Sequence, residues 1–210
     1  MAVAVALSVI GFGAENVNYD SVRQGQVPPG WSTHSTQQPT PWEVRSDRTA
    51  PSHPNVMMGR SGASGEAAAP VAVFDKIVCR DGDLSVKFRI SGDQRADAAG
   101  IVWRYQDPEN YYLLRLGADN SAVLERVRNG VTEVINSGGG KRAGEPLSIR
   151  PGQWHVVKVI FRGPDVRVFF GNRSLFTAQD SGLLNPGKTG LWAKGATGAA
   201  FDDFRIDKKG

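Results

Sequence analysis

Cysteine is nearly absent from this chain, which has a single one, Cys79, among 210 residues. One thiol excludes an internal disulfide framework and any zinc site built from several cysteines. Cys79 has no histidine close to it in the sequence. We therefore expect it to be a small buried hydrophobe rather than a reactive group.

Long runs of one charge are also missing. Basic residues never run longer than two together, as in Lys141-Arg142 and Lys208-Lys209, and 25 basic against 21 acidic residues leave a net charge of only +4. Nucleic-acid-binding proteins usually gather their cations in a stripe or patch. We therefore expect no nucleic-acid partner.

The only apolar run, residues 1–10, is too short to cross a bilayer core of about 30 Å. Its length and the small residues around Gly13 and Ala14 are typical of a signal peptide, although no Lys or Arg precedes Arg23. We expect residues 1–14 to be a signal peptide or its remnant and the protein to be exported, to the periplasm or outside the cell. A start codon further upstream, or a buried strand, would also explain this run. Because no second hydrophobic segment follows, we expect no integral membrane segment in the mature chain.

Catalytic and metal-binding patterns are scarce. A glycosidase needs two carboxyl groups on one face, about 5 to 10 Å apart. The acidic i, i+2 pairs Asp81/Asp83 and Asp107/Glu109 fall in expected turns, and no Glu-x-Asp-x-Glu run occurs. The three histidines are isolated along the chain, which argues against a zinc site. We expect no cofactor, and calcium held by loop aspartates stays open as an alternative.

Glycine and proline, in contrast, are plentiful, with 25 and 12 residues. Such a density of turn signals disfavours long helices and favours many short strands. Between Asn18 and Ala69 aliphatic residues are few, but Trp31 and Trp42 interrupt the polar sequence. We expect residues 15–70 to be an irregular N-terminal part of the same domain, held to the core by these two tryptophans.

From Val71 onward, apolar and polar residues alternate in short segments, the pattern of half-buried β-strands. Asn129-Gly130, flanked by two such segments, is the strongest short hairpin signal. About a dozen segments of this kind follow one another with no helical period. We expect residues 71–210 to form the main β-sandwich, an all-β jelly roll of two antiparallel sheets.

Alternation also predicts which functional side chains point away from the core. If the apolar neighbours point inward and the strands share a sheet, one open face carries Lys87, Arg89, Arg104, Tyr111 and Arg115. Arginine forks beside an aromatic ring suit polar ligands such as sugars, including acidic ones. The alternative is a solvated face on which the charges pair with Glu125 and its neighbours.

Two later strands show the same pattern. Trp192 and Lys194 lie on the face opposite Leu191 and Ala193, which makes Trp192 a better candidate for a sugar platform than Trp103, a residue that we expect in the core. In another strand, Arg167 and Phe169 point outward by alternation. Trp192 and Lys194 therefore join the candidate ligand-binding residues.

Two stretches carry a family resemblance. One is Gly-Ile-Val-Trp-Arg-Tyr followed by Asn-Tyr-Tyr and Arg115, in residues 100–115, and the other runs from Gly-Leu-Trp to a closing Phe-Asp-Asp-Phe, in residues 190–204. With shorter matches over roughly residues 18–206, they resemble the concanavalin A-like family of 3-keto-disaccharide hydrolase, or family-16 glycosyl hydrolase-like, domains. The resemblance implies an exported concanavalin A-like jelly roll associated with carbohydrate. It carries over no catalytic residues, because the acidic run of family-16 glycosidases is absent and residues 193–197 lack the aspartate that related domains tend to have.

The sequence therefore leads us to expect an exported carbohydrate-binding domain of the concanavalin A-like (LamG/jelly-roll) type, with an oligosaccharide or polysaccharide as its partner. In this hypothesis Arg104, Tyr111 and Arg115 hydrogen-bond to the sugar and stack on it. Trp192 and Lys194 lie at the rim of the same site.

Two alternatives remain at this point. The first is a 3-keto-disaccharide hydrolase-like enzyme, a hydrolase or lyase, whose acid and base meet across strands, with Asp203 and Glu125 as the partners. The second is an adhesion or structural module that has no glycan ligand.

Overall fold

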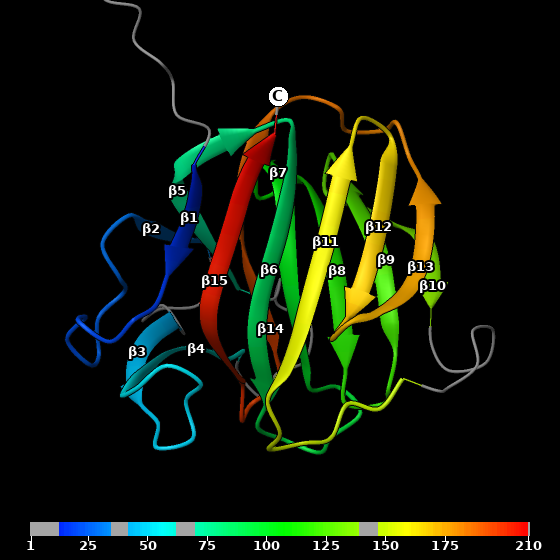
Figure 1. Cartoon of the computed structure of the whole chain (residues 1–210). Helices are drawn as coiled ribbons and strands as arrows, with labels where there is room; N and C mark the ends of the chain where they lie inside the picture. Colours follow the sequence, from blue (N-terminus) through cyan, green and yellow to red (C-terminus); the bar gives the residue numbers. More distant parts are fainter. Residues whose placement is uncertain (1–12, 35–41, 62–69, 139–146, 210) are drawn as a thin grey trace, which may run out of the picture.

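A computed structural model describes residues 13–34, 42–61, 70–138 and 147–209 of the chain. The regular structure of these residues consists of β-strands, which form two antiparallel sheets packed face to face (Figure 1). The expected all-β sandwich is therefore confirmed. The predicted signal peptide falls almost entirely outside the described residues and stays a prediction. Among the described residues there is no helix of the length and hydropathy that a membrane span requires.

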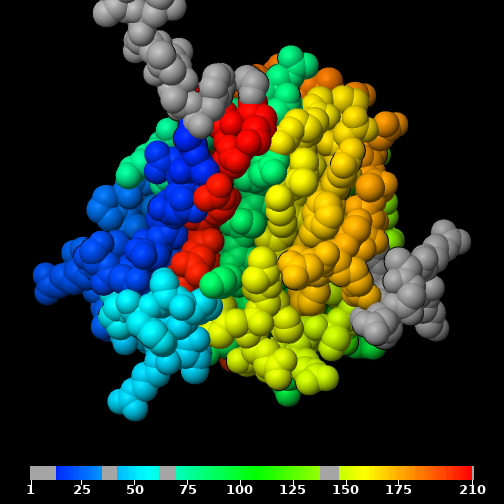
Figure 2. All heavy atoms as spheres, viewed as in Figure 1, coloured from blue at the N-terminus to red at the C-terminus, as the bar shows by residue number. Residues whose placement is uncertain are grey.

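The sheet nearer the viewer in Figure 1, the front sheet, has eight strands. Seven lie in the order β13 (Arg173–Gln179), β12 (Asp165–Phe170), β11 (His155–Arg162), β6 (Asp81–Ile90), β15 (Ala199–Lys209), β4 (Asn55–Gly59) and β3 (Trp42–Ser46). The eighth, β1 (Ala14–Val17), pairs with β15. We call the outer surface of this sheet, which Figure 2 shows, the front face.

The second sheet, the back sheet, has seven strands. Their order is β10 (Val131–Gly138), β9 (Ala122–Arg128), β8 (Asn110–Gly117), β7 (Ala98–Asp107), β14 (Gly187–Lys194), β5 (Val71–Cys79) and β2 (Trp31–His34). We call its outer surface, on the far side in Figure 1, the back face.

The N-terminal part of the chain belongs to both sheets. Trp31 and Trp42 are buried, at 7% and 1% exposure, as the sequence predicts. The expectation of an irregular segment needs correction, because this part also contributes the short strands β1, β2, β3 and β4. Each of them hydrogen-bonds to a longer strand from the rest of the chain or, for β3, to its neighbour β4, which supplies the stability that four or five residues lack alone.

The core between the sheets follows the alternation seen in the sequence. In β6 every second residue is buried, and Leu84, Val86, Phe88 and Ile90 are at most 1% exposed. Trp103 is fully buried, and Cys79 is a free, buried thiol in the same core. Burial raises the pKa of Cys79 to about 11. The predictions of a core tryptophan and of a small buried cysteine are confirmed, and the low reactivity of Cys79 stays a prediction.

Candidate functional site

The back face carries an apolar cluster of its own, separate from the core between the sheets. Its members come from β5, β7, β8 and β14 and are less than a tenth exposed: Val71, Val73, Ala98, Val102, Tyr105, Leu113 and Trp192. Tyr111 of β8 packs against them and is partly exposed. An antiparallel sheet normally turns a polar face to water. Because Tyr111 is the member that reaches solvent above this buried cluster, the surface around it is a candidate interaction site.

Aromatic rings lie beside one another in this cluster. The ring centroids of Tyr105 and Tyr111 are 5.5 Å apart, and the His34 ring lies 5.4 Å from that of Tyr105. Burial raises the pKa of both tyrosines, and the negative charge of Glu125 adds to the effect at Tyr111. Both phenols therefore stay protonated and can donate hydrogen bonds at neutral pH. The buried Tyr105 hydroxyl has no hydrogen-bond partner among the described residues.

The Trp192 indole lies against the backbone of the neighbouring strand β7. Trp192 is paired with Gly100, and a Cβ built on Gly100 would lie 3.2 Å from the indole Cε3 and 2.8 Å from the carbonyl oxygen of Leu114. Glycine at this position therefore makes room for the ring. Because the indole is only 6% exposed, it forms the floor of the cluster rather than an open platform.

Two pairs of hydrogen-bonding side chains lie on either side of the aromatic cluster. On β8 and β9, Arg115 Nε lies 3.3 Å from Glu125 Oε1. On β14 and β5, Lys188 Nζ lies 2.7 Å from Asp75 Oδ1, which also accepts a hydrogen bond of 3.1 Å from the Ser32 hydroxyl on β2. Each pair places a donor next to an acceptor, the arrangement that a sugar hydroxyl can use on both sides.

The structure brings together four of the five residues that the sequence predicts to bind sugar. Tyr111, Arg115, Trp192 and Lys194 all lie on the back face. Sequence reasoning did not find Asp75, Lys188, Ser32, His34 or the outward position of Tyr105. Ser32 and Asp75 become neighbours only when β2 pairs with β5, across more than 40 residues of sequence, so no local pattern signals them.

The fifth residue, Arg104, is placed differently from the prediction. Its side chain is fully buried, and it donates hydrogen bonds to the carbonyl oxygens of Arg80 at 2.9 Å, Leu183 at 3.0 Å and Gly163 at 2.6 Å. The cause is a bulge: the register of β7 with β8 shifts after Trp103, and Arg104 has a φ of 48°. A bulge reverses the alternation of side chains, so that Arg104 points inward and Tyr105 points to the back face.

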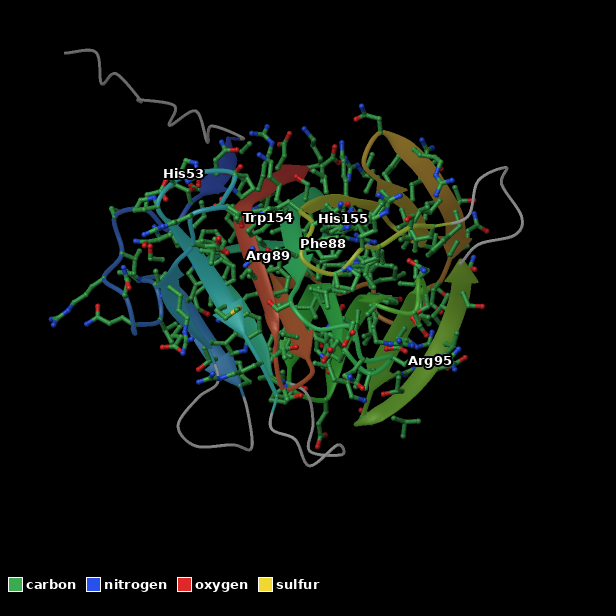
Figure 3. All side chains as sticks on the ribbon, turned by 90° about the horizontal axis from the view of Figure 1, so that it is seen from below. His53, Phe88, Arg89, Arg95, Trp154 and His155 are labelled. Atoms are coloured by element: carbon green, nitrogen blue, oxygen red, sulfur yellow. The ribbon has the colours of Figure 1, made fainter. Side chains whose placement is uncertain are left out.

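Lys87 and Arg89 do not share this face either, because β6 belongs to the front sheet. Arg89 forms an ion pair with Asp47, donates a 2.6 Å hydrogen bond to the Thr49 hydroxyl and lies 5.3 Å from the ring of Trp154. Figure 3 shows Arg89 and Trp154 together at the lower end of the sandwich. These contacts hold the loop between β3 and β4 against the sheet. They engage the guanidinium of Arg89 within the protein, so it does not serve as a ligand-binding group.

His155 lies near Arg89 and Trp154 in Figure 3 and packs at the lower end of the core. Its ring centroid lies 5.7 Å from that of Phe88 and 5.1 Å from that of Phe170. Burial lowers the pKa of His155, against a smaller opposing effect of its hydrogen bond to the backbone of Arg150. Packing contacts therefore explain the positions of Phe88, Arg89, Trp154 and His155 at the lower end of the sandwich.

The carboxyl groups proposed as an acid and base pair do not meet. Asp203 is on the front face, where it forms a 2.7 Å ion pair with Lys87, whereas Glu125 is on the back face with Arg115. The neighbouring Asp202 is buried and accepts hydrogen bonds from the backbone N–H and the hydroxyl of Ser52. The described residues contain no group of three or more His, Cys, Asp or Glu side chains that could hold a metal ion.

Comparisons with known proteins add a likeness of fold. No protein-family model matches this chain, and no curated protein sequence does. Among solved structures, it is similar to the carbohydrate-binding module CBM66 from Bacillus subtilis, at 17% identity over 85% of this chain and 92% of that one, with a TM-score of 0.59. A native glycosidic hydrolase matches at 11% identity over 97% and 99% of the two chains, with a TM-score of 0.54. The GH43 protein BlXynB from Bacillus licheniformis matches at 16% identity over 80% of this chain and 37% of that one, with a TM-score of 0.53. The likeness confirms the jelly-roll sandwich.

Proposed function

We propose that this protein is a carbohydrate-binding domain whose ligand lies across the back face. The observation that carries the proposal is the aromatic cluster of Tyr105, Tyr111 and Trp192 between two donor–acceptor pairs. Sugar rings have apolar C–H faces and hydroxyl edges, so they suit a surface that offers the partly exposed Tyr111 ring, supported by the buried Tyr105 and Trp192, and paired polar groups at the sides.

The exposed part of the site defines the expected contacts. Tyr111 is the ring on which a sugar would stack, and Arg115, with 30% of its side chain exposed, would donate to ring hydroxyls while Glu125 accepts from them. Lys194 has no ion-pair partner among the described residues and would donate at the rim. Trp192 would support the site from below, because its indole is already buried against β7.

Three further points belong to the proposal. The names of the similar structures, a carbohydrate-binding module and glycoside hydrolases, favour a saccharide ligand. We also propose export, on the apolar residues 1–10, and membership of the 3-keto-disaccharide hydrolase-like family, on the sequence resemblance. Detection of the native protein in a periplasmic or culture-medium fraction would support export, and its retention in the cytoplasm would contradict it.

The back face favours binding over glycoside cleavage. Its carboxyl groups in the aromatic region, Glu125 on β9 and Asp75 on β5, are four strand spacings apart, or about 19 Å. Glycosidases hold their two carboxyl groups within about 10 Å of each other. Each carboxylate here is also engaged by a cation.

Saturation-transfer NMR against a panel of neutral, acidic and 3-keto oligosaccharides tests the proposal. We expect transfer to at least one sugar and an affinity about tenfold lower in Tyr111→Ala and in Arg115→Ala, because each removes one contact worth about 1.4 kcal/mol. Tyr111→Phe keeps the ring and should lose less. Arg48→Ala, which removes an exposed arginine from the loop between β3 and β4, is the matched control.

Two results would overturn this function. Unchanged affinity in both Tyr111→Ala and Arg115→Ala, with melting temperatures equal to that of the parent, would remove the back face as the site. New anomeric signals over a day of incubation would show turnover and favour the enzyme alternative instead.

A further inference from the structure

The front face carries a second, independent candidate site. Alternation predicts that Arg167 and Phe169 point outward. The structure confirms it, because Val166, which precedes Arg167, and Val168, which lies between the two, are buried in the core. Strands β11, β12 and β13 lie side by side on the right of the front face (Figures 1 and 2). Two adjoining hollows, of about 220 and 500 Å³, open over them and share Asp165 and Arg167. We call them the front groove, lined by Ile160, Arg162, Asp165, Arg167, Thr177 and Gln179.

In the described part of the chain, cations outnumber carboxylates around this groove. Asp83 alone serves two cations, an ion pair with Arg162 and a second, at 3.4 Å, with Lys158. Asp165 accepts a 2.7 Å hydrogen bond from the Gln179 amide. Arg167 is exposed and has no ion-pair partner in the part of the chain that the structure describes. Among the residues that the structure describes, three cations therefore face two carboxylates, and the guanidinium of Arg167 lines both hollows of the groove together with Asp165.

The neighbours of Arg167 indicate what kind of anion would fit. A guanidinium fork matches a carboxylate with two parallel hydrogen bonds. Thr177, directly across from Arg167 on β13, offers a hydroxyl, and Gln179 offers an amide. Phe169, two residues along β12 on the same face, offers a partly exposed ring. A ligand with a carboxylate on a hydroxylated ring can use all of these groups: the carboxylate binds the guanidinium, the ring hydroxyls bind the Thr177 hydroxyl and the Gln179 amide, and the face of the ring packs on Phe169.

We infer that the front groove binds a uronate residue of an acidic polysaccharide, with the uronate carboxylate on Arg167. A protein partner is disfavoured because the hydrogen-bonding groups of the groove, on Arg162, Asp165, Arg167, Thr177 and Gln179, outnumber its apolar residues Ile160, Val166 and Ala178. The inference does not rest on the back-face site. If both hold, the domain has glycan sites on opposite faces of one sandwich and can bridge two polysaccharide chains.

Binding to polygalacturonate, measured by isothermal titration calorimetry beside neutral dextran as the comparison polymer, tests the inference. We expect the intact protein to bind polygalacturonate, Arg167→Ala to bind it about tenfold more weakly, and Arg167→Lys to fall between, because lysine keeps the charge and loses the fork. Raising the salt from 0.05 to 0.5 M should weaken binding, since the groove is open to solvent. Arg48→Ala removes a charge elsewhere on the surface and should bind as the parent does.

The back-face variant Arg115→Ala separates this site from the proposed function. Polygalacturonate affinity that Arg167→Ala lowers and Arg115→Ala leaves unchanged supports the front groove, whatever happens on the back face. The inference is wrong if the parent does not bind polygalacturonate, or if Arg167→Ala binds as tightly as Arg48→Ala. It is also wrong if dextran sulfate or phosphatidylglycerol vesicles bind as well as polygalacturonate, because the groove would then recognise charge alone.

Discussion

At the scale of the residue, Arg104 shows how one backbone angle changes a side chain's role. Its φ of 48° lies in the left-handed region, which costs an L-residue energy, and the strain persists because the guanidinium it places inside serves three carbonyl oxygens. Those carbonyls belong to Arg80, Leu183 and Gly163, which lie in three separate loops or strand ends. Arg104 thus joins segments that are far apart in the sequence, and its contribution is to stability.

We therefore predict that Arg104→Ala lowers the free energy of unfolding by about 3 kcal/mol or more, because it leaves buried acceptors unpaired and opens a cavity. Arg104→Lys should cost less, since one ammonium can still serve part of the carbonyl set. Urea unfolding followed by tryptophan fluorescence measures both. A loss below about 0.5 kcal/mol in Arg104→Ala, the range of ordinary surface substitutions, would contradict this structural role.

At the scale of the element, the β9–β10 hairpin shows local sequence in agreement with the fold. Asn129 and Gly130 have φ of 51° and 74°, so both central residues of the turn are left-handed, as a type I′ turn requires. Asn and Gly are the residues that adopt this conformation at least cost. The hairpin predicted from this dipeptide is confirmed, with Arg128 paired to Val131 across the turn.

Gly130→Ala should destabilise the protein by about 1 kcal/mol through the strain of a Cβ at positive φ. No crowding adds to this cost, since the nearest atom to a Cβ at this position would be 3.9 Å away, on Glu109. Gly130→Asn should cost less, because asparagine tolerates the left-handed region. The melting temperatures of Gly130→Ala, Gly130→Asn and the parent protein test this prediction. Equal melting temperatures for the two variants would contradict a conformational cause.

At the scale of the whole molecule, aromatic rings join the N-terminal part to both sheets. The Trp31 ring of β2 lies 5.3 Å from Phe74 in the back sheet and 5.0 Å from Phe204 in the front sheet. Tyr19, before β2, lies 6.2 Å from the same indole. This layer of rings explains why a segment poor in aliphatic residues is part of the sandwich, since aromatic side chains bury large areas.

Cys79, in the same core, reports on the opening of the whole sandwich. Its thiol is 1% exposed, and with a pKa of about 11 it stays protonated at pH 8. We predict negligible reaction with a disulfide reagent such as DTNB in native buffer and one thiol per chain in 6 M guanidinium chloride. Cys79→Ser provides the blank. A full equivalent released within minutes from the native protein would show that this part of the core opens readily.

The sequence by itself determined the fold class, the inward faces of strands such as β6, the turn at Asn129-Gly130, and the outward positions of Tyr111, Arg115, Trp192 and Lys194. These properties follow from alternation and turn chemistry, which depend on residues a few positions apart. Only the tertiary structure decided that Lys87 and Arg89 lie on the other sheet, that a bulge turns Arg104 inward, and that Ser32, Asp75 and Lys188 meet beside the aromatic rings. Strand pairing over long sequence separations depends on the packing of the whole sandwich, and a single inserted residue reverses alternation, so neither is visible in a local pattern.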